Sequence, residues 1–242
     1  MLELKDHRLY SEKEVKKNLL EKIEEARKFQ HNEKDKPLFK ESFNQIEPDG
    51  LTQNELEVLN LKVGVADCCC GRRDYMEDAH FAREIVFVVQ EKEYKASLVD
   101  VFDGHGCDAC SKHLSTHIEK AFVDRLQEHN RENLNETNIF NAMKVVFVDL
   151  SKNYPGENDG ANATAVLVTD SIAFVADVSD SRALIENNGE STTLSVDAKP
   201  QAQKFRQGIE QRGGNVIFSR GVYRVGSLIS LARTVGQKTL QE

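Results

Sequence analysis

The chain has 242 residues, of which 39% are hydrophobic, and its 40 acidic and 32 basic residues give a formal net charge of −8 at pH 7. This length suffices for one sizeable domain with an appendage, whereas the negative balance argues against a general nucleic-acid-binding protein, which would carry a basic face. No apolar run approaches the roughly 18–20 residues that cross a bilayer, and residues 1–6 lack the basic and then apolar layout of a signal peptide. The sequence therefore predicts a cytoplasmic protein with neither a membrane nor nucleic acid among its partners.

Residues 1–60 differ from the rest of the chain, because half of the first 40 are charged. A capping box at Ser11–Glu14 precedes an apolar stripe at helical spacing, which predicts a helix over 12–29. The proline-containing and charged residues 31–50 read as a linker. We therefore expect a charged helical extension and linker over 1–60, with a globular domain over 61–242. The helix either packs on that domain or binds a partner.

From Leu61 the pattern is globular, and runs of β-forming residues alternate with blocks at helical spacing. The predicted strands are Leu61–Ala66, Phe81–Val89, Tyr94–Phe102, Thr164–Val168, Ala173–Val178, Ala183–Ile185, Val216–Phe218, Val222–Val225 and Leu228–Leu231. The predicted helices are Cys107–Leu126, Thr137–Leu150 with Asn135 as its cap, and Gln201–Arg212, which ends at Gly213. Strands joined by short turns, with helices inserted in blocks, indicate an α+β fold of mainly antiparallel sheets covered by helices.

Five cysteines suit a reducing compartment as free thiols. Three are consecutive, Cys68–Cys70, and Cys107 and Cys110 form a Cys-x-x-Cys pair. A structural zinc site or a redox pair would use the same residues. Consecutive cysteines are poorly spaced for tetrahedral ligation, so buried or half-buried thiols are the favoured interpretation.

Two acidic clusters flank the predicted hairpin Phe81–Val89 and Tyr94–Phe102. Glu77 and Asp78 precede its first strand, and Asp103-Gly104-His105 follows its second. If Val89 faces Tyr94 across a turn at residues 90–93, antiparallel pairing brings Asp78 near His105 and sets Asp103 opposite His80. Carboxylates gathered in this way repel one another unless a cation lies among them, and Mg²⁺ or Mn²⁺ prefers such oxygen ligands. The alternative for an isolated Asp-Gly-x-Gly is a tight turn with no ligand.

The ordered motifs resemble those of the metal-dependent protein serine/threonine phosphatases, the protein phosphatase 2C (PPM) family. The matching segments, in chain order, are Arg73–Asp78, Val101–Gly106, Thr164–Val166, Val175–Arg182, Asp197–Pro200 and Arg224–Gly236. The resemblance covers about Leu61 to Gly236, and it implies a two-layer antiparallel β-sandwich flanked by helices (α-β-β-α).

By this resemblance, a metal-activated water hydrolyses phosphoserine or phosphothreonine in a phosphoprotein substrate, with two Mg²⁺ or Mn²⁺ ions expected in the family. Asp103 would bridge both ions, and Glu77 and the Gly104 carbonyl would hold one of them. Asp78 would act at the metal site or through its waters, and Asp180 matches the carboxylate of a third, weaker metal position.

The same resemblance implies catalytic roles for two further residues. Arg73 would bind phosphate oxygens with its planar guanidinium. His105 would protonate the departing serine or threonine oxygen, a role that suits the titration range of histidine.

The match weakens toward the C-terminus. Ser179, Ala198, Ala232 and Gln237 stand where the family pattern has glycine, histidine, serine and aspartate. Two late aspartates that complete the first metal's shell have no counterpart after Gly236, so only one ion is well supported and the fold is expected to be incomplete at its C-terminus. The sequence thus predicts a protein phosphatase that is cut short or degraded at its C-terminus or, alternatively, a catalytically impaired pseudophosphatase that binds phosphoproteins or regulates a partner. A third interpretation is a structural or interaction module in which the N-terminal helix is the working part.

Overall fold

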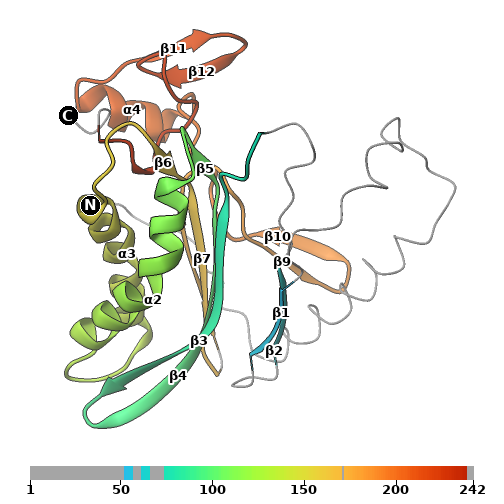
Figure 1. The fold of residues 1–242 in the computed structure, drawn as a ribbon, viewed down its shortest axis with the longest axis vertical. Helices are drawn as coiled ribbons and strands as arrows, with labels where there is room; N and C mark the ends of the chain where they lie inside the picture. Colours follow the sequence, from blue (N-terminus) through green and yellow to red (C-terminus); the bar gives the residue numbers. More distant parts are fainter. Residues whose placement is uncertain (1–51, 57–60, 66–73, 171, 239–242) are drawn as a thin grey trace, which may run out of the picture.

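A computed structural model describes residues 52–56, 61–65, 74–170 and 172–238 of the chain (Figure 1). The predicted N-terminal helix over 12–29, the linker over 31–50, Cys68–Cys70 and Arg73 lie outside the described residues. Among the helices that are described, none is long and apolar enough to cross a membrane.

The centre of the fold is a four-stranded antiparallel sheet with the strand order β3-β4-β7-β8 (Figure 1). Its strands are β3 (Ala79–Val89), β4 (Lys92–Phe102), β7 (Ala163–Val168) and β8 (Ala173–Val178). Every neighbouring pair is antiparallel. Each strand was expected, and the last coincides with its predicted bounds.

The β3–β4 hairpin is tighter than predicted. Val89 pairs with Lys92, not with Tyr94, so the turn contains only Gln90 and Glu91. Both turn residues have positive φ, 50° and 63°, as a two-residue type I′ turn requires. The sequence prediction was therefore wrong by two residues in register. Because side chains alternate with a period of two, this shift leaves every residue on its expected face of the sheet.

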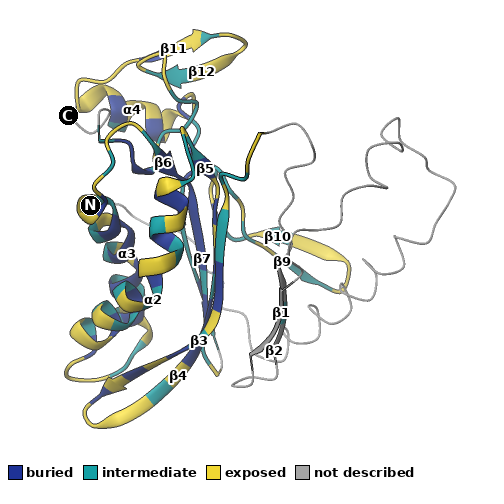
Figure 2. Cartoon of the chain, in the orientation of Figure 1, coloured by how far each residue is buried: buried dark blue, intermediate teal, exposed yellow. Residues whose placement is uncertain are grey.

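Two helices cover one face of this sheet, α2 (Ala109–His129) and α3 (Glu136–Asn153) (Figure 1). The Asn135 side chain caps α3 by accepting a hydrogen bond of 2.9 Å from the Asn138 backbone N–H, as predicted. Their apolar faces and the sheet form a single core (Figure 2). Its largest fully buried side chains include Phe87, Phe102, Phe122, Leu114 and Leu167.

Smaller elements surround the central sheet. They are β1 (Thr52–Leu56) with β2 (Leu61–Val65), β9 (Leu184–Asn187) with β10 (Glu190–Thr193), and α4 (Gln203–Gln211) followed by β11 (Val216–Ser219) and β12 (Val222–Val225). In Figure 1, β1, β2, β9 and β10 lie on the side of the central sheet away from α2 and α3. The strand predicted at Leu228–Leu231 was wrong, because that segment makes only one isolated bridge, between Val225 and Ile229.

Three very short strands were not anticipated. They are β5 (Gly104–His105), β6 (Gly160–Ala161) and β13 (Val235–Gly236), which form a sheet in the order β13-β6-β5. With them, the described part of the chain is an α+β fold of helices and antiparallel sheets, as the sequence predicted.

One carboxylic acid lies inside the core. Asp100 of β4 faces Phe81 and Ala165 in the neighbouring strands and is only 1% exposed. Both of its carboxyl oxygens lack a hydrogen-bond partner among the described residues. Burial raises the pKa of the Asp100 carboxyl well above its ordinary value, because the charged form loses its hydration without compensation.

We predict that Asp100→Ala increases the free energy of unfolding by about 2 kcal/mol at pH 7, since it removes a buried group without partners. As pH rises above about 3.9, the unfolded state releases this proton before the folded state does. The stability of the unmodified chain therefore falls relative to the variant until pH passes the raised folded-state pKa. Urea unfolding between pH 4 and pH 8 measures this, with exposed Asp124→Ala as the control. A stability gain that does not grow with pH would contradict the prediction.

Candidate metal and phosphate site

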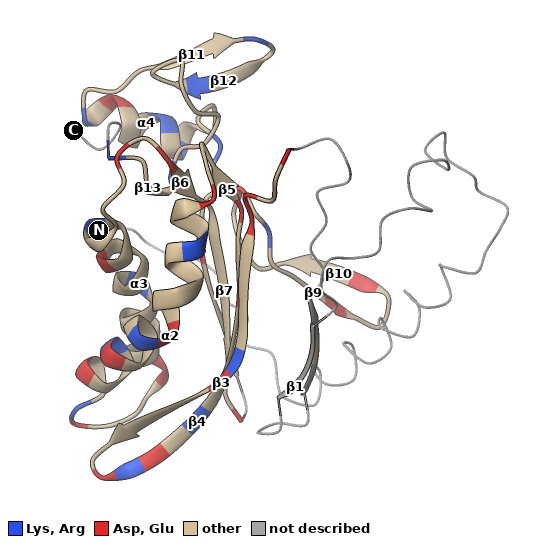
Figure 3. Cartoon of the chain, in the orientation of Figure 1, with Lys and Arg blue, Asp and Glu red and all other residues tan. Residues whose placement is uncertain are grey.

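The acidic clusters meet at the open end of the β3–β4 hairpin. The ladder ends with Ala79 paired to Phe102, so Asp78 and Asp103 are the next residues on either side. The Asp78 and Asp103 side chains are exposed, whereas Glu77 is half-buried. The structure therefore brings three of the predicted metal ligands to the open end of the β3–β4 hairpin, where ions can enter from solvent and where acidic residues are drawn in red in Figure 3.

Gly104 sits in close contact with the segment that carries Glu77. A Cβ atom added to Gly104 would lie 2.1 Å from the Glu77 carbonyl oxygen. The Ser111 hydroxyl of α2 lies within hydrogen-bonding distance of the same carbonyl and 3.0 Å from the Asp108 carbonyl, so its one proton is shared between the two oxygens. The absence of a side chain at Gly104 and the start of α2 together fix the backbone between the two acidic clusters.

His105 belongs to the small sheet beside these carboxylates. In β5 it pairs with Gly160 of β6, and its Nε2 lies 2.8 Å from the Thr234 hydroxyl. Burial lowers the pKa of the His105 imidazole, while the nearby carboxylates of Asp159, Glu77 and Asp180 oppose that shift. Its ring is therefore held in one orientation next to the site.

Asn162 is a site residue that the sequence analysis missed. Its Nδ2 lies 3.2 Å from Asp103 Oδ2 and 2.9 Å from Asp180 Oδ1, so one amide joins the two carboxylates. The Asn162 backbone N–H also donates to the Asp103 carbonyl at 2.9 Å. These contacts span 59 and 18 residues of sequence, and no local pattern predicts them.

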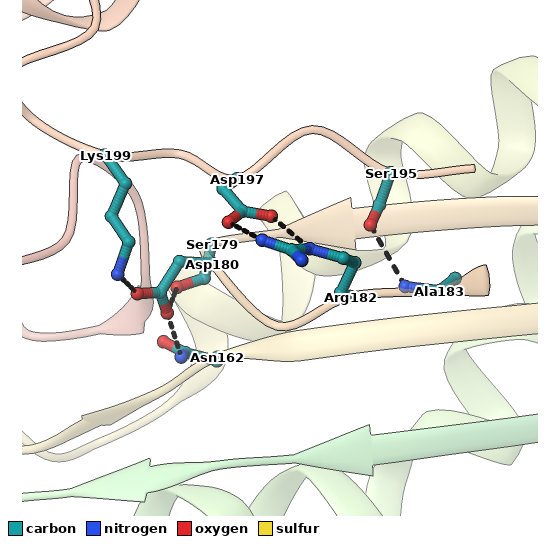
Figure 4. A network of polar contacts seen from close by, with 8 residues as sticks. All are labelled: Asn162, Ser179, Asp180, Arg182, Ala183, Ser195, Asp197 and Lys199. Carbon is teal, nitrogen blue, oxygen red and sulfur yellow. Dashed lines mark hydrogen bonds and ion pairs between the residues drawn. The ribbon is translucent and has the colours of Figure 1, made fainter. Parts of the chain in front are cut away.

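Asp180 lies on the loop after β8 and is held by several donors (Figure 4). Lys199 forms an ion pair with its Oδ2, and the Ser179 hydroxyl lies 3.4 Å from its Oδ1. Beside it, Arg182 binds Asp197 through two hydrogen bonds. The Ala198 backbone N–H donates to the Ser179 carbonyl at 2.6 Å, which ties this loop to the segment after β10.

Gln237 stands at a position where the family pattern has aspartate. Its hydrogen bonds go to two backbone carbonyls and not to the carboxylates described above. Its side-chain Nε2 donates to the Asn158 carbonyl at 3.1 Å, and its backbone N–H donates to the Asp159 carbonyl at 2.7 Å. Gln237 is buried and has positive φ. Its role in the structure is thus to anchor the end of β13 to the loop before β6.

The fold and the site define the class of protein: an antiparallel α+β domain with acidic residues and a histidine close to the open end of one hairpin. A sequence profile described as Protein phosphatase 2C matches residues 62–242. The chain belongs to the protein phosphatase 2C family.

Curated relatives agree with this assignment. Probable protein phosphatase 2C 52 of Oryza sativa subsp. japonica is 28% identical over 172 residues, which cover 71% of this chain and 34% of that protein. Protein phosphatase 1L of Bos taurus is 28% identical over 181 residues, which cover 71% of this chain and 48% of that protein. The chain thus spans less than half the length of these curated relatives.

Solved structures share the fold. A C. elegans sex determining protein aligns with a TM-score of 0.57 at 20% identity, covering 69% of this chain and 42% of the other. A phosphatase from a pathogenic strain of Toxoplasma gondii aligns with a TM-score of 0.50 at 21% identity, covering 70% and 62%. At this level of identity, the likeness shows the fold alone.

Membership of the family implies divalent metal ions. In this structure the oxygens near Asp103 suit such ions better than those of Asp180. Asp103 offers an exposed carboxylate and is followed by Gly104, whose backbone lies against the Glu77 carbonyl. Carboxylate and carbonyl oxygens are hard ligands of the kind that suits Mg²⁺ or Mn²⁺. The oxygens of Asp180, by contrast, are already bound by Lys199 and Asn162. Across residues 74–170 and 172–238, no three His, Cys, Asp or Glu side chains are arranged to hold one metal ion together.

Cys107 and Cys110, the pair considered for zinc or redox chemistry, are both free thiols. Cys110 is buried, and burial raises the pKa of its thiol to about 12. The Cys110 sulfur lies 3.6 Å from the Val235 carbonyl oxygen. This residue packs as a buried neutral thiol beneath β13, in agreement with the favoured interpretation.

We predict that Gly104→Ala destabilises the fold by about 1–3 kcal/mol, because the added Cβ must push the Glu77 carbonyl away. The same displacement should weaken Mn²⁺ binding at least about 10-fold. Chemical denaturation and calorimetric Mn²⁺ titration measure the two effects.

The matched control is Gly208→Ala in α4, where the nearest atom to an added Cβ is 3.6 Å away. That variant should leave Mn²⁺ affinity unchanged and stabilise the helix by roughly 0.5–1 kcal/mol. If Gly104→Ala behaves like Gly208→Ala, the close approach of Gly104 to Glu77 has no functional importance.

Proposed function

We propose that this chain provides the metal-binding part of a protein serine/threonine phosphatase, which hydrolyses phosphoserine and phosphothreonine in phosphoproteins. The observation that carries the proposal is the position of Asp103. It is an exposed carboxylate at the open end of the β3–β4 hairpin, next to Glu77 and His105, in a chain of the protein phosphatase 2C family.

Within this proposal, Asp103, Glu77 and the Gly104 carbonyl would hold Mg²⁺ or Mn²⁺, and exposed Asp78 would act at the same site directly or through water. Such ions would supply the positive charge that neutralises a phosphomonoester and lowers the pKa of an attacking water. His105 protonates the departing serine or threonine oxygen from its fixed position beside the small sheet. Arg73, which lies outside the described residues, would bind the phosphate oxygens.

The remaining expectations about partners and location stay predictions. A phosphoprotein substrate follows from the proposed activity. A partner for residues 12–29 and a cytosolic location were expected from the sequence alone.

A second candidate function is a catalytically impaired pseudophosphatase that binds phosphoproteins. Two observations favour it. The Asp180 carboxylate is paired with Lys199, and the Gln237 side chain is engaged with the Asn158 carbonyl. Both groups match family positions expected to support a metal, so fewer ligands are left for the ions that drive turnover.

We predict Mn²⁺-dependent release of phosphate from a phosphothreonine peptide, reduced about 100-fold or more by Asp103→Asn because the variant loses the charged central ligand. Malachite-green phosphate assays measure turnover, and calorimetry measures Mn²⁺ binding. Asp124→Asn on the exposed surface of α2 is the control and should retain full turnover.

The two candidates differ in one result. Peptide binding in the presence of Mn²⁺ without phosphate release would select the pseudophosphatase. If Asp103→Asn retains the turnover of the unmodified chain, the proposed metal site at Asp103 is wrong.

We predict that His105→Asn slows hydrolysis of the phosphothreonine peptide about 100-fold but hydrolysis of p-nitrophenyl phosphate by less than about 10-fold. The reason is that an alkoxide needs protonation to leave, whereas p-nitrophenolate is a weak base that leaves unassisted. Steady-state kcat for the two substrates measures the contrast, with His117→Asn on the exposed face of α2 as the control. Equal losses on both substrates would assign His105 a structural role instead.

A further inference from the structure

The Asp180 carboxylate has donors on both of its oxygens. Oδ1 receives a hydrogen bond of 2.9 Å from Asn162 Nδ2, and the Ser179 hydroxyl lies 3.4 Å from it. Oδ2 is paired with the Lys199 ammonium. Figure 4 shows these groups converging on Asp180 from three segments of the chain. The carboxylate is therefore held by the protein itself.

Asn162 extends this arrangement to Asp103. The side chain is 2% exposed, and its Nδ2 contacts a carboxylate oxygen of each aspartate. Its own Oδ1 is buried and has no hydrogen-bond partner among the described residues. A buried amide whose carbonyl oxygen has no hydrogen-bond partner lowers the stability of the fold. The amide nitrogen of Asn162 contacts only carboxylates, those of Asp103 and Asp180, among the described residues.

Two carboxylates within reach of one nitrogen repel each other strongly unless positive charge lies nearby. Lys199 is the only cation with an ion pair to Asp180 in the described ranges, and the neighbouring Arg182 binds Asp197 instead. Lys199 thus provides the charge, and Asn162 the bridging contact, that a divalent ion between the aspartates would otherwise supply.

We propose that Lys199 and Asn162 together replace a divalent cation at Asp180. In the unmodified chain Asp180 is then not a metal ligand, and metal binding is confined to the Asp103 side of Asn162. Removal of the ammonium would convert Asp180 into a ligand for one additional ion. This inference goes beyond the proposed phosphatase function, because it concerns ion occupancy and holds whether or not the chain turns over substrate.

The test is the number of Mn²⁺ ions bound, measured by electron paramagnetic resonance of free Mn²⁺ and by calorimetry. Lys199→Met, which keeps the apolar stem and removes the charge, should bind one more Mn²⁺ than the unmodified chain. Lys199→Arg keeps the charge and should bind the same number as the unmodified chain. The matched control Arg182→Met breaks the neighbouring ion pair with Asp197 and should add no ion.

Removal of the carboxylate charge identifies where the additional ion binds. Lys199→Met combined with Asp180→Asn should lose the added Mn²⁺. Asp180→Asn alone should leave the number of ions unchanged from that of the unmodified chain. The proposal is overturned if Asp180→Asn alone loses an ion, or if Lys199→Met gains none while it remains folded.

If Lys199→Met fails to fold, comparison of Asp180→Asn with the unmodified chain still tests the proposal. Loss of one bound Mn²⁺ in Asp180→Asn contradicts the proposal, and an unchanged number of bound Mn²⁺ ions supports it. The outcome is also separable from that of the proposed function. An unmodified chain that binds no Mn²⁺ at all defeats the phosphatase site, yet a Mn²⁺ ion gained in Lys199→Met would still support the replacement of a metal by Lys199.

Discussion

The site depends on the antiparallel pairing of β3 with β4. The two strands form a ladder of eleven residue pairs, from Val89 with Lys92 to Ala79 with Phe102. This pairing places two acidic segments at the same end of the hairpin. The ladder is held in place by its apolar face, which packs under α2 and α3. A slip of one residue would turn that face to solvent, so the energy of the core also fixes the distance between Asp78 and Asp103.

One polar residue beside Asp180 holds a backbone conformation that costs stability. Ser179 has φ of 140°, a region that side-chain-bearing residues rarely adopt and that costs about 1–3 kcal/mol. Its carbonyl accepts the Ala198 N–H and its hydroxyl lies near Asp180, so the surrounding contacts enforce the conformation. The glycine that the family pattern has here would adopt it without strain. This departure thus has a physical consequence that the sequence comparison alone did not reveal.

Local sequence patterns were sufficient to predict the main strands and helices. Runs of β-forming residues identified the central strands, and helical spacing identified α2 and α3. The turn at Gln90-Glu91 was predicted too long, because neither residue is typical of a type I′ turn. The two-residue strands β5, β6 and β13 are too short to show a period. The bridge from Asn162 to Asp103 and Asp180 arises only when three distant segments meet.

Charge balance accounts for the different surroundings of the two aspartates. A carboxylate near other carboxylates needs either water or a cation. Asp103 is exposed, so ions in solvent can reach its carboxylate. Asp180 is half-buried and has Lys199 as a tethered counter-ion. A tethered ammonium cannot be diluted away, so it holds the loop after β8 in place at any metal concentration. However, it supplies one positive charge where a metal supplies two. If both proposals hold, these two modes of neutralisation divide the site into a part at Asp103 that binds metal and a part at Asp180 whose structure does not depend on metal.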